Sequence, residues 1–180
     1  MFEKQDYLNW DETFISLAKL IALRSKDPST QVGAVIVDQD NKILSLGYNG
    51  APNGFDDKIF PWKKQGSALE TKFPFVCHGE LNAIANYSGD RKRLDNSKIY
   101  VTLFPCNECC KIIIQSGIKE VIYAKIKHEE RVDVKASKIM FDICKIKYRK
   151  YDQINNIIIP NNDSAYTTNN VKMLAKSKVK

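Results

Sequence analysis

The sequence predicts an α/β fold, a three-layer α-β-α sandwich built around a five-stranded mixed sheet. Two observations support this prediction. Five short apolar stretches bounded by turn residues are typical of strands. The later stretches are separated by segments with helical spacing, so that strand and helix alternate, which favours parallel strands flanked by helices. The 180 residues, of which 43% are hydrophobic, fit one domain with a sizeable core.

The first elements expected are a helix and a β-hairpin. Apolar side chains recur every three or four positions over residues 10–24, which predicts a helix, and Pro28 prevents it from continuing. Residues 32–37 and 42–47 are apolar runs joined by four turn residues. They predict two antiparallel strands.

The second half of the chain predicts three helices and three strands in alternation. A proline favours the start of a helix, and a glycine favours the position just after its end, which places one helix between Pro105 and Gly117. The expected elements are a helix from about residue 78, a strand at 98–103, the helix just described, a strand at 120–125, a helix at 132–144 and a strand at 147–151.

A long stretch without periodicity, residues 51–75, separates the hairpin from the second helix. It follows the segment 47–54, in which three glycines permit sharp turns or a close approach of the backbone to another group. Such a stretch can be a plain connection. Its length favours a lid or a binding loop, because long unstructured connections in compact domains commonly have that role.

The charge distribution predicts a domain and a tail. Residues 1–160 are expected to form the domain, and residues 161–180 a basic, disordered C-terminal tail. The net charge is +7, and the four lysines at the end of the tail leave 7 − 4 = +3 for residues 1–171. Those lysines are Lys172, Lys176, Lys178 and Lys180. A lysine-rich terminus is more often solvated than a binding element, so nucleic acid is not expected as a partner.

Cysteine usage and hydropathy predict a soluble, cytoplasmic protein without a membrane partner. No apolar run approaches the roughly 20 residues that span a bilayer, and residues 1–10 mix charged and aromatic side chains where a signal peptide is apolar. The five cysteines are an odd number, and three lie within five residues of one another. This arrangement favours a metal site over a disulfide framework.

Four residues form a candidate catalytic metal site. His78 is followed two residues later by Glu80, and Cys106 and Cys109 form a C-x-x-C pair. Zinc binds imidazole and thiolates tetrahedrally, and catalytic sites leave the fourth position to water. We expect Glu80 to transfer protons without binding the metal. A structural zinc site would normally have a fourth Cys or His ligand and would leave Glu80 without a role.

The arrangement H-x-E followed by P-C-x-x-C is the pattern of zinc-dependent deaminases. Beyond that pattern, the chain resembles the deoxycytidylate deaminases in residues 24–28, 47–50, 75–84, 100–109 and 117–122. The resemblance extends from about Tyr7 to Tyr151. It implies a cytidine deaminase-like fold and conversion of dCMP to dUMP for thymidylate synthesis. It also implies zinc bound by His78, Cys106 and Cys109, with Glu80 as the proton shuttle.

The resemblance further implies that the loop at 47–54 contacts a small-molecule nucleotide substrate. Asn49 is expected on the sugar, with Tyr48, Gly50 and Asn53 nearby. A monophosphate also needs cationic or amide partners, and Arg24 and Lys26 are the candidates chosen from the sequence.

Regulation and assembly are implied by the resemblance alone. Members of this family are typically homo-oligomers, most often hexamers, activated by dCTP with Mg2+ and inhibited by dTTP. Lys127-His128 stands where relatives often carry an aromatic residue near the substrate.

Two other functions remain open at this stage. The first is a nucleic-acid cytosine or adenosine deaminase that uses the basic tail as an electrostatic anchor. The second is a non-catalytic, zinc-stabilised interaction module, in which Glu80 would be dispensable.

Overall fold

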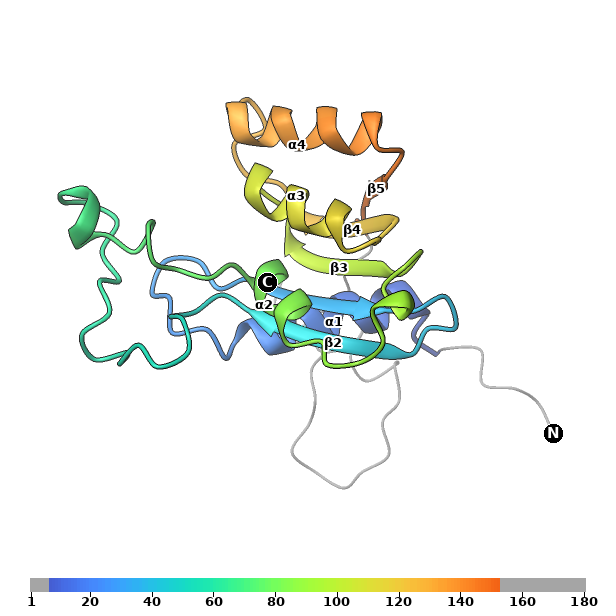
Figure 1. Cartoon of the computed structure of the whole chain (residues 1–180), viewed down its shortest axis with the longest axis horizontal. Helices are drawn as coiled ribbons and strands as arrows, with labels where there is room; N and C mark the ends of the chain where they lie inside the picture. The colour runs from blue at the N-terminus through green and yellow to red at the C-terminus, as the bar shows by residue number, and fades with distance from the viewer. Residues whose placement is uncertain (1–6, 153–180) are drawn as a thin grey trace, which may run out of the picture.

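A five-stranded mixed sheet forms the middle layer of the protein (Figure 1). The strands are β1 (Gly33–Val37), β2 (Ile43–Tyr48), β3 (Lys98–Leu103), β4 (Glu120–Lys125) and β5 (Lys147–Lys150). Their order in the sheet is β2-β1-β3-β4-β5. β1 pairs antiparallel with both β2 and β3, whereas β3, β4 and β5 are parallel. The predicted hairpin and mixed sheet are therefore confirmed.

This computed structural model describes residues 7–152, so the tail predicted at 161–180 lies outside the described residues. Within them, no helix combines the length and the apolar character needed to cross a membrane.

Helices cover both faces of the sheet, which confirms the three-layer sandwich (Figure 1). α1 (Trp10–Ala22) packs against one face. On the other side α2 (Gly79–Ala85) packs against β1 and β2, α3 (Asn107–Gln115) lies next to α2, and α4 (Val132–Ile143) packs against α3. Two short 3-10 helices, η1 (Ala68–Glu70) and η2 (Arg91–Arg93), lie in the connections.

The alternation of side chains along β1 divides the hydrophobic core between the two faces. Val35 and Val37 pack with the α1 side of the core, whereas Ala34 and Ile36 pack on the side of the other three helices. Successive side chains of a strand point to opposite faces. Because both faces of β1 are covered, this strand is apolar at every position except Gly33.

The third helix begins later than the sequence predicts. The chain remains extended after β3, because the backbone N–H of Phe104 donates to the carbonyl of Lys125 at 2.8 Å. Cys106 is the N-cap residue of α3, and the helix starts at Asn107, not at Pro105. Gly117 follows the helix with φ of 83°, as expected for a glycine that ends a helix.

The long segment after β2 leaves the sheet and returns to the same place. At its two ends, Gly50 and Cys77 form a β-bridge with backbone hydrogen bonds of 3.0 and 2.9 Å. Between them the segment forms a lobe beside the sandwich (Figure 1). Phe55 packs against Phe60 and Phe75, with ring centroids 5.1 and 6.2 Å apart. Although it has no regular periodicity, the segment therefore has an aromatic cluster of its own.

We expect Gly47→Ala to lower the free energy of unfolding by about 1–3 kcal/mol, the range for overpacked sites. A Cβ at position 47 would lie 2.2 Å from the backbone N of Ala83 and 2.3 Å from the carbonyl O of Gly79. Chemical denaturation measures the loss. Gly50→Ala is the matched control, because its added Cβ would meet nothing closer than 3.8 Å. Equal losses of stability in the two variants would show that the close packing of α2 against β2 at Gly47 is not the cause of the loss.

Candidate metal centre

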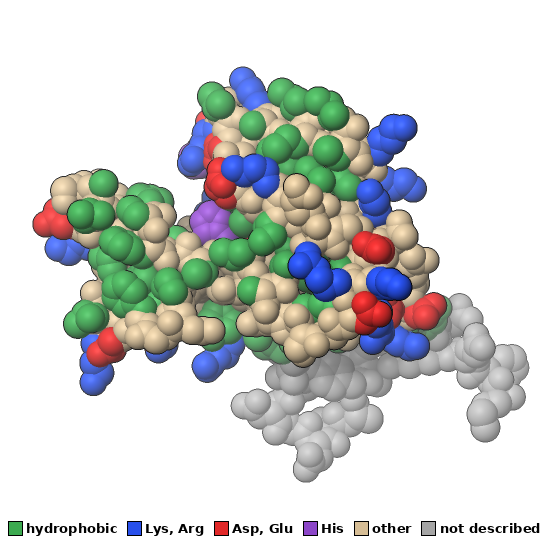
Figure 2. Space-filling model, viewed as in Figure 1, with side chains coloured by type: hydrophobic (Ala, Val, Ile, Leu, Met, Phe, Trp, Pro, Cys, Tyr) green, Lys and Arg blue, Asp and Glu red, His purple; other side chains and the backbone are tan. Residues whose placement is uncertain are grey.

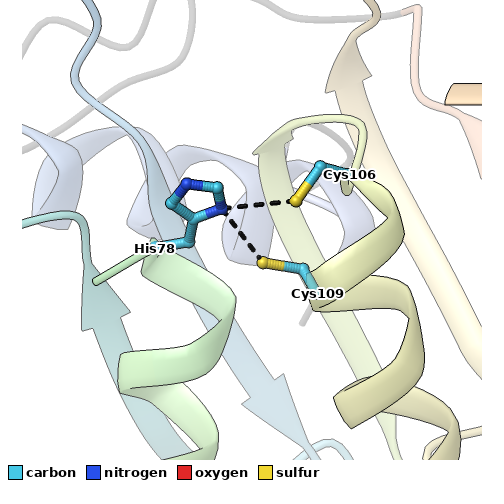
Figure 3. Close-up of side chains that lie close together, drawn as sticks. All are labelled: His78, Cys106 and Cys109. Atoms are coloured by element: carbon cyan, nitrogen blue, oxygen red, sulfur yellow. Dashed lines mark hydrogen bonds between the residues drawn. The ribbon is translucent and has the colours of Figure 1, made fainter. Parts of the chain in front are cut away.

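Three metal-binding side chains converge between α2 and α3. Nδ1 of His78 lies 3.4 Å from Sγ of Cys106 and 3.3 Å from Sγ of Cys109. Figure 3 shows these side chains pointing toward one another. Tetrahedral zinc, with bonds of about 2.1 Å to nitrogen and 2.3 Å to sulfur, places these donors about 3.6 Å apart. The donor set and its spacing therefore fit a zinc ion with three protein ligands.

Two helix N-termini position these ligands. His78 is the N-cap residue of α2, Cys106 is the N-cap residue of α3, and Cys109 lies in the first turn of α3. A hydrogen bond from Cys109 lowers the pKa of the Cys106 thiol to about 4, even though burial opposes this shift, and a hydrogen bond with His78 adds to it. The same hydrogen bond, together with burial, raises the pKa of Cys109, so the two thiols share one proton and Cys106 is the thiolate, the form that binds metal.

Glu80 lies beside the cluster without belonging to it. It is the second residue of α2, only 4% exposed, and its Oε2 is 3.5 Å from Sγ of Cys109. Burial raises the pKa of this carboxyl. A raised pKa makes the carboxylate a stronger base than an ordinary glutamate, which favours a role in proton transfer.

A cavity of about 390 Å³ opens above the cluster, a volume that suits a small molecule. His78, Cys106 and Glu80 line it. Figure 2 shows a hollow between the lobe and the rest of the molecule, with a histidine in it. The cations around the cavity are Lys64, Lys72, Lys127 and Arg131, and His128 also lines it.

Among the substrate-binding residues expected from the sequence, the structure brings Asn49 to this cavity. The cavity lining does not include Tyr48, Gly50, Asn53, Arg24 or Lys26. The side chains around position 25 alternate, so that Ser25 and Asp27 are buried while Arg24 and Lys26 are exposed. Lys26 instead forms an ion pair with Asp57.

Asn49 holds together the loop that forms one wall of the cavity. Its side-chain nitrogen donates to Oδ2 of Asp27 at 3.1 Å and to the carbonyl of Thr30 at 3.0 Å. Its Oδ1 accepts from the backbone N–H of Val32 at 2.7 Å. Asp27 also forms a buried ion pair with Lys72. This pair connects the lobe to the same wall.

We expect Lys72→Met to lower the free energy of unfolding by about 3–5 kcal/mol at pH 7, because it leaves the buried Asp27 carboxylate without its cation. Burial opposes ionisation of Asp27, but hydrogen bonds from Lys72 and the backbone N–H groups of Ser29 and Thr30 outweigh it, so the pKa of Asp27 lies below its usual value. The stabilisation is therefore present above the unfolded pKa of about 3.9 and is lost as the pH falls through the folded pKa. Denaturation as a function of pH measures both effects.

The matched control is Lys26→Met, which breaks the exposed ion pair with Asp57. The Lys26 side chain is 62% exposed, so its pair should contribute about 0–1 kcal/mol. If both lysine variants lose the same stability, the buried pair of Lys72 with Asp27 contributes no more to stability than the exposed pair of Lys26 with Asp57.

The fold and this site together define a class of protein, the zinc-binding hydrolases with a cytidine deaminase-like sandwich. A family model, the cytidine and deoxycytidylate deaminase zinc-binding region, matches residues 8–125. Deoxycytidylate deaminase of Mus musculus is 49% identical over 151 residues, with 83% of each chain covered. The human deoxycytidylate deaminase is 47% identical over 150 residues, again with 83% of each chain covered.

A solved structure agrees with these relatives. The dCMP deaminase from the cyanophage S-TIM5, in complex with dCMP and dUMP, aligns with a TM-score of 0.63 and 26% identity over 81% of this chain and 100% of that chain. The chain therefore belongs to the cytidine and deoxycytidylate deaminase family, and it is a deaminase.

Proposed function

We propose that this enzyme hydrolyses dCMP to dUMP and ammonia, and so supplies dUMP for thymidylate synthesis. The observation that carries the proposal is the convergence of His78, Cys106 and Cys109 beside the buried Glu80 at one cavity. The activity named for the mouse and human relatives, and the dCMP and dUMP in the cyanophage structure, support this choice of substrate.

In the proposed mechanism, His78, Cys106 and Cys109 hold zinc, and Glu80 moves the protons. Bound zinc supplies a Lewis acid that lowers the pKa of water from 15.7 toward about 7. Glu80 takes a proton from the water whose oxygen attacks the carbon that bears the exocyclic amine. It delivers this proton to the ring nitrogen, and it then carries the remaining proton of the attacking oxygen to the departing amine. The C–N bond breaks, ammonia leaves and a carbonyl remains.

Cations at the cavity are proposed to bind the 5′-phosphate. Lys72 is already paired with Asp27, and Arg131 with Asp133. Lys64 and Lys127 line the cavity without an ion pair among the described residues, and so they are the better candidates. Arg24 and Lys26 were the sequence-based candidates, and that prediction is untested.

We expect Asn49→Ala to raise KM for dCMP, lower kcat, or do both, with zinc content unchanged. The amide is proposed to contact the sugar, and it also holds Asp27, Thr30 and Val32 in the wall of the cavity. Steady-state kinetics and metal analysis measure the two quantities. Asn86→Ala is the control, because Asn86 is exposed and does not line the cavity. If Asn49→Ala kept the wild-type KM and kcat, Asn49 would contribute neither to binding of the substrate nor to its turnover.

The experiment that tests the proposed function is ammonia release by the purified zinc-loaded protein. The substrates are dCMP, deoxycytidine, CMP and a cytosine-containing oligonucleotide. Turnover of dCMP above the others is the expected result. Turnover of the oligonucleotide alone would favour a nucleic-acid deaminase, and the absence of any turnover would favour the non-catalytic zinc module.

Regulation and assembly are proposed from the family resemblance. We propose a homo-oligomer, a hexamer by analogy, that is activated by dCTP with Mg2+, inhibited by dTTP and located in the cytoplasm. Light scattering measures the assembly. Repeating the ammonia assay with each effector, with and without Mg2+, measures the regulation.

A further inference from the structure

An aromatic side chain of the lobe, that of Phe73, lines the cavity above the metal-binding cluster. It is 62% exposed, and within residues 7–152 its ring contacts no other aromatic ring. Phe75, two residues later, packs instead against Phe55 in the aromatic cluster of the lobe. Phe73 therefore presents an open ring to the space that the substrate enters, and the proposed reaction gives it no role.

Exposure alone does not indicate a function for this ring, because single apolar side chains are common on protein surfaces. Ile59 and Leu69, in the same lobe, are each 74% exposed and do not line the cavity. Phe73 differs from both in its position at the cavity. It also differs in the support of its backbone.

The neighbouring residue, Lys72, holds the backbone of Phe73 in place. The backbone N–H of Lys72 donates to the carbonyl of Lys63 at 3.0 Å, and its own carbonyl accepts from the N–H of Val76 at 2.8 Å. The side chain of Lys72 forms the buried ion pair with Asp27. A side chain that is positioned before its ligand arrives loses little conformational freedom on binding. The ring is therefore placed to contact a ligand at low entropic cost.

The proposed reaction places the parts of a nucleotide at different depths of the cavity. The base must reach the metal-binding cluster beside Glu80, which is only 4% exposed. The phosphate is assigned to cations that include Lys64, which lines the cavity from the lobe, as Phe73 does. The sugar lies between the base and the phosphate. Because the ring is far more exposed than Glu80 and comes from the lobe that supplies the cation, it is placed to contact the sugar.

We propose that Phe73 is a specificity-determining residue, whose ring packs against the sugar of the nucleotide and favours 2′-deoxyribose over ribose. This inference rests on the proposed function. The C–H groups of the sugar bury apolar surface against the ring. A 2′-hydroxyl in the same contact loses its hydrogen bonds to water and gains none from the ring. The 2′-methylene of a deoxyribose has no such loss.

The test compares the steady-state kinetics of ammonia release from dCMP and CMP. The zinc-loaded, full 180-residue enzyme is used as wild type and as Phe73→Ala, Phe73→Gln and Phe73→Tyr. Glutamine removes the ring and offers hydrogen bonds to a ribose hydroxyl, whereas tyrosine keeps the ring. Leu69→Ala is the matched control, because Leu69 is an exposed apolar residue of the lobe that does not line the cavity. Zinc content, melting temperature and molar mass by light scattering are measured for each protein.

We expect Phe73→Ala to raise KM for dCMP about 10-fold with little change in kcat, because the contact is made in the bound substrate and in the transition state alike. The ratio of kcat/KM for dCMP to that for CMP should fall about 10-fold, within the range for discrimination by an apolar contact. Phe73→Gln should lower this ratio at least as much. Phe73→Tyr and Leu69→Ala should keep the wild-type values.

Three results would overturn the proposal. The first is an unchanged KM for dCMP in Phe73→Ala and Phe73→Gln. The second is an equal rise of KM for dCMP and CMP, which would place the ring against the base or the phosphate. The third is a changed molar mass in Phe73→Ala, which would place the ring in an interface between copies of the chain. In each of these cases the wild type still turns over dCMP, whereas a wild type without turnover would contradict the proposed function itself.

Discussion

Glu80→Gln is expected to lower kcat for dCMP by about 10²–10⁴-fold while one zinc per chain remains bound. Glutamine keeps the size of the side chain but cannot accept or deliver the proton, and general acid–base catalysis contributes about this factor. Glu80 is outside the set of three metal-binding side chains. Stopped-flow or steady-state ammonia release gives the rate, and metal analysis gives the zinc content.

Glu70→Gln is the control for this substitution, because Glu70 is an exposed residue of η1 away from the cavity. It should retain wild-type turnover. If Glu80→Gln also retained its rate, the proton shuttle would have to be another group, and the non-catalytic module would regain support.

Cys106→Ala is expected to abolish both stoichiometric zinc binding and measurable turnover. Removal of one of three protein ligands leaves two, and metal binding is coupled to the packing of α2 against α3. Zinc should therefore raise the melting temperature of the wild-type apoprotein and have little effect on the variant. Metal analysis and thermal unfolding with and without zinc measure the two effects.

Cys110→Ala provides a matched control, because Cys110 is also a cysteine of α3, is fully buried and is not among the metal-binding side chains. It should lose some stability from a smaller core side chain and keep its zinc. Stoichiometric zinc in Cys106→Ala, or its loss in Cys110→Ala, would contradict the ligand assignment.

The regular elements could be predicted because their periodicity is local. β3 and β4 have the bounds expected at 98–103 and 120–125, since each strand has apolar residues over a length typical of strands and is followed by residues that favour turns or helix starts. The convergence of His78, Cys106 and Cys109 could also be predicted, because two short motifs contain these donor residues. The start of α3 could not, because the chain extends past β3 through a bond to Lys125, which is distant in the sequence.

The ion pair in the wall of the cavity could not be predicted, because it joins residues that are distant in the sequence. Lys72 lies in a stretch without periodicity, and nothing in its neighbours indicates that it is buried against Asp27, 45 residues earlier. The sequence suggested Arg24 and Lys26 as phosphate ligands because they are cations in a matching segment. The direction of each side chain depends on the path of the loop, and here the intervening Ser25 is the buried residue.

The bridge between Gly50 and Cys77 has a consequence for how such a protein can vary. The lobe leaves and rejoins the sandwich at this bridge, and Lys72 joins it to Asp27 shortly before the bridge closes. The part that can vary is therefore the stretch between Gly50 and Lys72, and His78 directly follows Cys77 of the bridge. Doubling the length of a flexible loop costs only about 0.6 kcal/mol. Insertions or deletions in that stretch that leave Lys72 in place can therefore remodel the entrance to the cavity, and with it the choice of substrate, while the metal ligands keep their positions.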